Sequence, residues 1–293
     1  MAIKESISRR VFVVCNAVVL ILLAVMALFP FVNVIASSFA TSLELTMRPF
    51  MLFPYNPTIQ AYRYIFSTNT FINALRNSVF VTVIGTIINL TMTYLMAYPL
   101  SHKTLVGRRK LMNLIVFTML FSGGMVPAYL NLKQLGMIDT YWALWLPGAI
   151  STFNLIVMKN FIQQIPDELK EAARIDGANE LYILIRVILP LSLPVLATFC
   201  LFYAVSLWNS YFDCMLYINT SSKWTVQVLL RQIILTAQGL GDQDAMGHSA
   251  RAIIPSEAVK NAAVLVATLP ILIVYPFLQK YFAKGALLGS VKG

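Results

Sequence analysis

The sequence predicts an all-α polytopic membrane protein with six transmembrane helices in a single domain, residues 1–293. Three observations lead to this fold class. Of the 293 residues, 58% are hydrophobic and only 12% are charged, whereas a soluble protein carries about a quarter charged residues. Long charge-free apolar runs recur along the chain, and such runs suit the thickness of a bilayer. Lys and Arg are denser in alternate connecting segments, which predicts the orientation of the helices across the membrane.

The first two predicted spans cover about residues 11–37 and 78–101. The basic start of the chain, with Arg9 and Arg10, places the beginning of the first span on the cytoplasmic side. Its apolar run is longer than the hydrophobic region of a signal peptide, which has about 7–15 residues, so we expect a helix that is retained. The second span is free of charge and follows a mixed outer segment.

The third and fourth predicted spans cover residues 111–130 and 141–162. The basic segment 102–110 before them marks a cytoplasmic loop. A Ser-Gly-Gly sequence at 122–124 and Pro127 predict a break inside the third span. Such a break can line a wet cavity or can be a simple packing kink, and the sequence leaves both interpretations open.

The last two predicted spans cover residues 191–218 and 261–278. The long polar region 219–260 between them is expected outside, with a short amphipathic helix at about 224–235. The tail after the sixth span is basic, so both termini are expected in the cytoplasm.

The most informative polar stretch is the coupling segment, residues 164–190, between the fourth and fifth spans. We expect two short helices joined by Gly177. Pro166 suits the first helical position, Asn179 suits the N-cap of the second helix, and Pro190 is expected to end it. A segment that lies on anionic lipid should be basic, but this one mixes acids and bases. A short helix of this kind suits a groove on a protein partner; the alternative is an ordinary solvated loop.

The sequence EAARIDGA, followed by ILP, resembles the EAA loop of permease subunits of bacterial ABC importers. The matching residues are Glu171, Ala172, Ala173, Asp176, Gly177, Leu189 and Pro190. In that family, which has the fold of a type I ABC importer transmembrane domain, this loop is a cytoplasmic coupling helix. It docks on an ATP-hydrolysing subunit and passes nucleotide-driven motion to the membrane helices, so the resemblance implies an ATPase-coupling role for these residues.

Three further segments narrow the resemblance, which covers nearly the whole chain. FSGGMVPAYL, WNSYFDCMLYI and the C-terminal LQKYFAKGALLGSVKG resemble carbohydrate-importing permeases of the MalG type, closest to the branch that serves complex or acidic oligosaccharides, such as fragments of alginate or pectin. The resemblance implies a bacterial inner-membrane location and a heterodimer with a second homologous permease. It also implies two ATP-binding subunits, which would hold ATP and Mg, and an extracytoplasmic solute-binding protein that contacts the segment 219–260.

The sequence lacks the residues that enzymatic chemistry needs. It contains no GxxxxGK[ST] phosphate-binding loop and no evident nucleophile–base cluster, so we expect no ATP hydrolysis and no cofactor in this chain. Its three cysteines and two histidines are too scattered for a metal site. No basic patch with interleaved aromatic residues predicts nucleic-acid binding.

The ionisable residues of the predicted spans indicate how transport is powered, and alternative functions remain. Apart from Lys159 and Asp213 near span ends, the predicted spans carry no ionisable residues, and a proton-coupled carrier needs such groups in the membrane. A partner ATPase therefore suits the chain better. A self-sufficient ion-coupled secondary transporter remains the alternative, because backbone carbonyls can hold sodium, and an ABC importer for another solute is not excluded by the EAA loop.

The candidate substrate-path residues are Trp208, Asn209, Tyr211 and Asp213. Sugar binding needs a few hydrogen-bonding groups beside apolar and aromatic surfaces. The alternative is that Trp208 and Tyr211 anchor the helix at the membrane interface, and that Asn209 bonds to a neighbouring helix.

Overall fold

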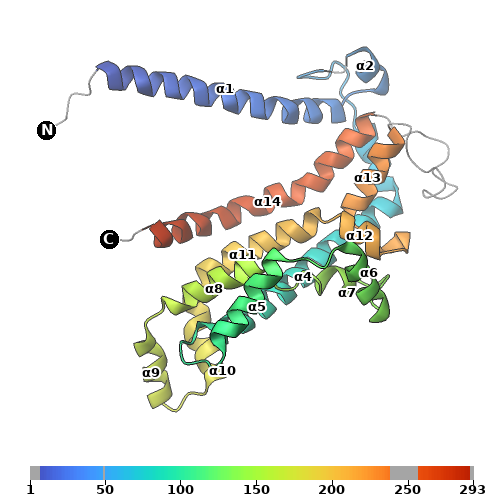
Figure 1. Ribbon diagram of the computed structural model, residues 1–293. Coiled ribbons are helices and arrows are strands. Elements are labelled where there is room, and N and C mark those ends of the chain that lie inside the picture. Colours follow the sequence, from blue (N-terminus) through green and yellow to red (C-terminus); the bar gives the residue numbers. More distant parts are fainter. Residues whose placement is uncertain (1–6, 49, 238–256, 291–293) are drawn as a thin grey trace. The chain divides into compact units, whose positions relative to one another are not determined.

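The computed structural model describes residues 7–48, 50–237 and 257–290 of the chain (Figure 1). Within these ranges all regular secondary structure is helical, which confirms the all-α prediction. The described chain divides into two compact units. One contains the residues up to 69 and the described residues between 230 and 268, and the other contains residues 70–229 and the described residues from 269 onward.

The first unit begins with α1 (Ile7–Ser38), followed by α2 (Ser42–Met47) and α3 (Gln60–Ser67). None of the most apolar stretch of α1 is buried within the protein, so its surface suits contact with lipid or with another membrane subunit. A hydrogen bond of 2.7 Å between the hydroxyl groups of Ser38 and Tyr62 ties the end of α1 to α3.

The second unit contains helices of very different lengths. In chain order they are α4 (Asn69–Ser101), α5 (Arg108–Leu120), α6 (Met125–Gln134), α7 (Trp142–Trp145), α8 (Thr152–Gln163), α9 (Asp167–Ile175), α10 (Glu180–Tyr182), α11 (Leu189–Asn209) and α12 (Phe212–Tyr217). A short 3-10 helix covers Ser221–Lys223. The remaining helices, α13 (Val226–Ala237) and α14 (Glu257–Ser290), contribute residues to both units.

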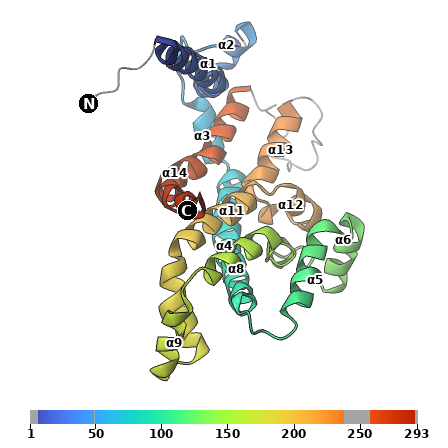
Figure 2. The ribbon, with the colours of Figure 1, turned by 60° about the vertical axis from the view of Figure 1, so that its left-hand side comes forward.

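The core of the second unit lies between α4, α8 and α11, which pack side by side (Figure 2). Fully or almost fully buried side chains fill it, among them Ala97, Leu155, Met158, Ile162, Ile183, Ile188 and Phe199. Within this unit α9 lies at one end of the helices, and α7 and α12 lie at the other (Figure 1). The unit therefore has two distinct ends, as a transmembrane bundle requires.

Four helices in the described residues are long and apolar enough to cross a membrane. They are α1, α4, a continuous helix over Glu180–Asn209, and α14 as far as Pro276. The pair α5 and α6 passes the same test together, with a bend of 115° at the predicted break. The prediction of several apolar spans is confirmed, whereas the predicted number of six exceeds the four or five that these helices provide.

The predicted fourth span, residues 141–162, is not one helix. It consists of α7 and α8, with a non-helical connection over residues 146–151. Pro147 in this connection lacks an N–H for the helical ladder. Ser151 then starts a new helix as the N-cap of α8, so local sequence overrides the apolar periodicity.

The predicted fifth span, residues 191–218, is also placed differently. The helix begins earlier, at Glu180, and ends at Asn209, so Pro190 does not end the second short helix of the coupling segment. A π-helical turn over Ile183–Ile188 precedes this proline. The wider turn provides room for the proline ring, which would otherwise meet a carbonyl group of the preceding turn.

Candidate functional site

The coupling segment folds around α9 largely as its sequence dictates. Asp167 lies in the first turn of α9, where the helix dipole favours negative charge, and Pro166 is the N-cap, one position earlier than predicted. Gly177 has a φ of 82°, which confirms its left-handed conformation. The Ala178 N–H donates to the Ala173 carbonyl at 2.9 Å, and this bond closes the end of the helix.

The next helix starts at the predicted N-cap. The Asn179 side-chain oxygen accepts a hydrogen bond of 2.8 Å from the Tyr182 N–H, which satisfies one of the free donors at the start of a helix. This cap fixes the direction in which the chain leaves α9 and enters the long helix that ends at Asn209.

One side of α9 faces solvent. The EAA-type residues Glu171, Ala172, Asp176 and Gly177 are exposed, and Ala173 is half-buried. Ile175 lies beside them with 87% of its surface exposed. Lys170 instead is buried and donates to Asp167 at 2.9 Å. Ile175 therefore adds apolar surface to the exposed side of α9.

Glu180 ties α9 to α4 at the base of the coupling segment. One of its carboxylate oxygens accepts hydrogen bonds from Arg174 Nε and Nη2 at 3.0 and 2.8 Å. The other accepts one of 2.6 Å from the Tyr98 hydroxyl on α4. The His102 ring packs edge-on against Tyr98 at 4.8 Å, and burial together with the charge of Lys170 lowers the pKa of His102. The predicted cytoplasmic segments 102–110 and 164–190 thus lie at the same end of the second unit.

A cavity of about 360 Å³ lies in the second unit, between α4, the connection after α7, α8, α11 and α12. Amides, hydroxyls and one carboxylate make up its polar lining: Asn89, Ser151, Asn154, Tyr203, Ser206, Ser210, Asp213 and Tyr217. Phe202, Leu207 and Pro147 add apolar surface. A small number of polar groups on an apolar wall is the usual composition of a small-molecule site.

Two contacts hold the wall of this cavity in place. The Tyr203 hydroxyl lies 2.7 Å from the Thr93 hydroxyl and accepts a hydrogen bond of 3.0 Å from the Ser151 N–H. On α4, Gly85 lets neighbouring helices approach closely, since a Cβ there would lie 2.7 Å from both Leu207 Cδ1 and Trp145 Cδ1. The cavity therefore depends on packing between α4, α7 and α11.

Asn89 is the least satisfied polar side chain in the lining. Only 3% of its surface is exposed, and its Oδ1 has no hydrogen-bond partner among the residues that the structure describes. A buried acceptor without a partner costs about 1–3 kcal/mol. The oxygen itself has almost no accessible surface, so it does not open onto the cavity although the residue contributes to the lining.

The structure does not bring the four substrate-path candidates together. Asp213 lines the cavity and accepts a hydrogen bond of 3.0 Å from Ser210. Trp208 is buried, Tyr211 is 40% exposed, and Asn209 is exposed and donates to the Val205 carbonyl of its own helix at 2.9 Å. None of these three lines the cavity.

Sequence reasoning missed most of the cavity lining. Asn89, Ser151, Asn154 and Ser206 are isolated polar residues in apolar runs, a signal that is present in the sequence. The same signal fits helix packing equally well, so only the fold shows that these side chains face one space.

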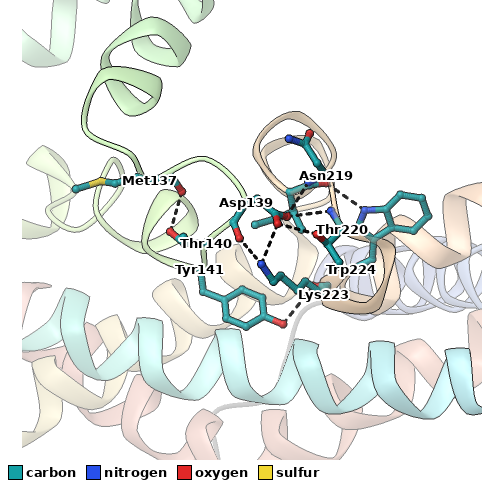
Figure 3. Close-up of polar contacts among 9 residues, drawn as sticks. Met137, Asp139, Thr140, Tyr141, Asn219, Thr220, Lys223 and Trp224 are labelled. Atoms are coloured by element: carbon teal, nitrogen blue, oxygen red, sulfur yellow. Dashed lines mark hydrogen bonds and ion pairs between the residues drawn. The ribbon is translucent and has the colours of Figure 1, made fainter.

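Asp139 organises the end of the unit opposite α9 (Figure 3). Its carboxylate accepts hydrogen bonds from the Asn219 and Thr220 N–H groups at 3.0 and 2.9 Å, from the Thr220 hydroxyl at 2.7 Å and from Lys223 Nζ at 2.9 Å. These bonds, those from Thr220 foremost, lower the pKa of Asp139. The Asp139 clamp joins residues 131–140, which connect the third and fourth predicted spans, to residues 219–224, which belong to the region predicted to lie outside.

Comparison with known proteins gives a consistent result. Residues 96–287 match the family described as binding-protein-dependent transport system inner membrane component. The chain is 54% identical over 275 residues to a polygalacturonan/rhamnogalacturonan transport system permease protein of Bacillus subtilis, covering 94% of this chain and 96% of that one. It is 29% identical to the trehalose/maltose transport system permease protein of Thermococcus litoralis, over 99% of both chains.

A solved structure shows the same fold. It is a crystal structure of a bacterial ABC transporter involved in the import of the acidic polysaccharide alginate, with a TM-score of 0.87 and 34% sequence identity. The match covers 96% of this chain and 100% of the other. The helix arrangement described above is therefore that of an ABC importer permease.

Proposed function

The chain belongs to the family of inner-membrane components of binding-protein-dependent transport systems, and we propose that it carries an oligosaccharide from a plant or algal acidic polysaccharide, of the pectin or alginate class, into a bacterial cell. The observation that carries this proposal is the 54% identity, over nearly the full length of both chains, to a polygalacturonan/rhamnogalacturonan permease. The likeness to an importer of alginate, another acidic polysaccharide, supports the same class of substrate.

The chain is a transporter subunit and not an enzyme, because ATP hydrolysis in this family belongs to separate subunits. We propose the full set of partners that the resemblance implies: a second homologous permease, two ATP-binding subunits with their ATP and Mg, and a solute-binding protein outside. Six spans with both termini in the cytoplasm are part of this proposal, in which α7 and α8 together form the span that the helix lengths alone do not reveal.

The exposed side of α9 is the proposed contact with an ATP-binding subunit. Glu171, Ala172, Ala173, Asp176 and Gly177 form this surface, and the exposed Ile175 beside them supplies apolar area. The helix that follows is continuous from Glu180 to Asn209, so a displacement of α9 is passed along a single element to the level of the cavity. Pro190 follows the π-helical turn of this element, and the helix is best able to bend there.

The substrate path is proposed to run past Asp213 in the cavity and past the exposed side chains Asn209 and Tyr211, where a second permease can complete it, with buried Trp208 supporting that helix end. Asn209→Leu should reduce uptake without reducing assembly. Unchanged uptake and affinity would return Asn209 to a purely structural role.

The decisive experiment is uptake into vesicles that contain the purified complex, with this chain either unchanged or carrying Glu171→Lys. We expect ATP-dependent uptake of oligogalacturonate with the unchanged chain, and loss of both uptake and ATPase copurification with the variant. Uptake that follows an ion gradient without any ATPase would instead support the ion-coupled carrier.

A further inference from the structure

We propose that Tyr94 of α4 is a positioning residue for coupling: its hydroxyl holds the π-helical turn Ile183–Ile188 against α4, so that α4 moves together with the start of the long helix when α9 is displaced. This inference rests on the proposed function, in which α9 receives the motion of an ATP-binding subunit. It adds α4 as a second route for that motion, beside the helix that ends at Asn209.

Two hydroxyl groups of α4 bond to the start of the long helix. The Tyr98 hydroxyl donates to the Glu180 carboxylate at 2.6 Å, and the Tyr94 hydroxyl donates to the Leu184 main-chain carbonyl at 3.1 Å. The two tyrosines are four residues apart on α4, and their two partners are also four residues apart. Residues at this spacing lie on one side of a helix. The two bonds therefore join the same two helix surfaces and fix the start of the long helix against both sliding and rotation.

The carbonyl that Tyr94 contacts belongs to the part of the long helix that bends most easily. It also accepts the N–H of Leu189, five residues further on, which is the hydrogen bond of a π-helical turn. The next residue, Pro190, has no N–H to donate to the preceding turn. Helices kink at π-helical turns and at prolines. A displacement of α9 would thus be absorbed at this turn unless another element holds the turn in place.

The hydrogen bond from Tyr94 lies in the core of the second unit. Only 7% of the surface of Tyr94 and 6% of that of Leu184 are exposed, and both residues pack between α4, α8 and α11. Water does not readily replace a hydrogen bond that breaks in such surroundings, and a buried polar group left without a partner is costly. The bond therefore opposes any bend that carries the π-helical turn away from α4.

α4 connects this turn directly to the cavity. Asn89, which belongs to the cavity lining, lies on α4 five residues before Tyr94, a distance of about 7.5 Å along the helix. When the turn is held against α4, a displacement of α9 moves both α4 and α11 at the cavity. When the turn is released, α9 can move while the cavity stays as it is, and ATP is then hydrolysed without transport.

The competing explanation is that Tyr94 only stabilises the fold. Its ring fills the core, and its hydroxyl satisfies a buried carbonyl. In that case loss of the hydroxyl lowers the unfolding temperature but leaves the amount of sugar imported per ATP hydrolysed unchanged. The ratio of transport to hydrolysis therefore separates a positioning role from a purely structural one.

The test uses Tyr94→Phe, which removes one oxygen and keeps the ring, in the assembled complex in vesicles with saturating, oligogalacturonate-loaded binding protein. Uptake and ATP hydrolysis are measured in the same preparation. Loss of one buried hydrogen bond shifts a conformational equilibrium by about two- to tenfold. We expect the sugar imported per ATP hydrolysed to fall by about twofold or more, while the binding protein still stimulates ATP hydrolysis. Tyr98→Phe removes the second bond and should lower the same ratio, so it provides the test if Tyr94→Phe does not assemble.

Tyr62→Phe is the matched control. The Tyr62 hydroxyl shares a hydrogen bond of 2.7 Å with Ser38 in the first unit, so the same atom is removed from a bonded tyrosine far in sequence from the coupling segment. It should leave the ratio unchanged. An unchanged ratio in Tyr94→Phe, with or without a lower unfolding temperature, would overturn the positioning role, while ATP-dependent uptake by the unchanged complex still upholds the proposed function. Failure of the unchanged complex to import the sugar would refute the proposed function itself.

Discussion

Gly85→Ala tests the packing on which the cavity depends. The added methyl carbon would lie 2.7 Å from Leu207 Cδ1, 2.7 Å from Trp145 Cδ1 and 2.9 Å from Trp145 Nε1. Carbon atoms in good contact are about 3.5–4.0 Å apart, so a neighbour must move by roughly 1 Å. The leucine can rotate, but the indole N–H donates to the Val81 carbonyl at 3.0 Å and holds the tryptophan in place.

The expected magnitude follows from three opposing effects. Overpacking of this kind costs about 1–3 kcal/mol, and a displaced Trp145 loses a hydrogen bond worth about 0.5–1.5 kcal/mol. Alanine recovers up to about 1 kcal/mol relative to glycine through its higher helix propensity. The balance is a destabilisation of about 1–3 kcal/mol, and the unfolding temperature should fall by about 2–4 °C for each kcal/mol.

The assay is thermal unfolding of the purified complex in nanodiscs, with Gly123→Ala as the control. A methyl group at Gly123 would meet nothing within 4 Å, and its φ is not positive. We expect Gly85→Ala to unfold at a lower temperature than either the control or the unchanged protein. Equal unfolding temperatures for all three would refute the close approach of α7 and α11 to α4.

Three other perturbations address the two ends of the second unit. Gly177→Val should impair coupling, because a β-branched residue tolerates a φ of 82° poorly; normal transport and normal copurification of the ATPase would contradict this. Glu180→Gln should reduce the sugar imported per ATP hydrolysed by weakening the bonds to Arg174 and Tyr98, and an unchanged ratio would show that Glu180 has no part in coupling. Because the folded-state pKa of Asp139 is lowered, its contribution to stability is present above the unfolded value of about 3.9 and is lost as the pH falls through the folded value. Unfolding measured from pH 7 down to pH 3 should thus show a difference between Asp139→Asn and the unchanged chain that shrinks below about pH 4, and a constant difference would contradict the Asp139 clamp.

The sequence predicts best what local chemistry determines. The φ of Gly177 and the cap at Asn179 follow from the conformational freedom of glycine and the short side chain of asparagine. Likewise, the inner and outer segments that Lys and Arg distinguish gather at opposite ends of the second unit, as the contacts of Glu180 and Asp139 show.

What the sequence does not predict depends on contacts between distant residues. Asn89 and Asp213 line one cavity only because α4, α11 and α12 meet there. The two residues are far apart in the sequence, and nothing in their sequence positions indicates that they are close in space. The end of the long helix at Asn209 was misplaced and the break before Ser151 was not predicted, because the apolar run continues across both positions.

The continuous helix from Glu180 to Asn209 relates the displacement of its α9 end to the displacement of its cavity end. Thirty residues at 1.5 Å each make a rod about 45 Å long. If the rod pivots near its middle, the cavity end moves as far as the α9 end. If it pivots close to α9, the cavity end moves farther than the α9 end. The π-helical turn at Ile183–Ile188 lies at the α9 end. A bend there would shorten the stiff part of the helix at its α9 end, so that a small displacement of α9 is absorbed before it reaches the cavity.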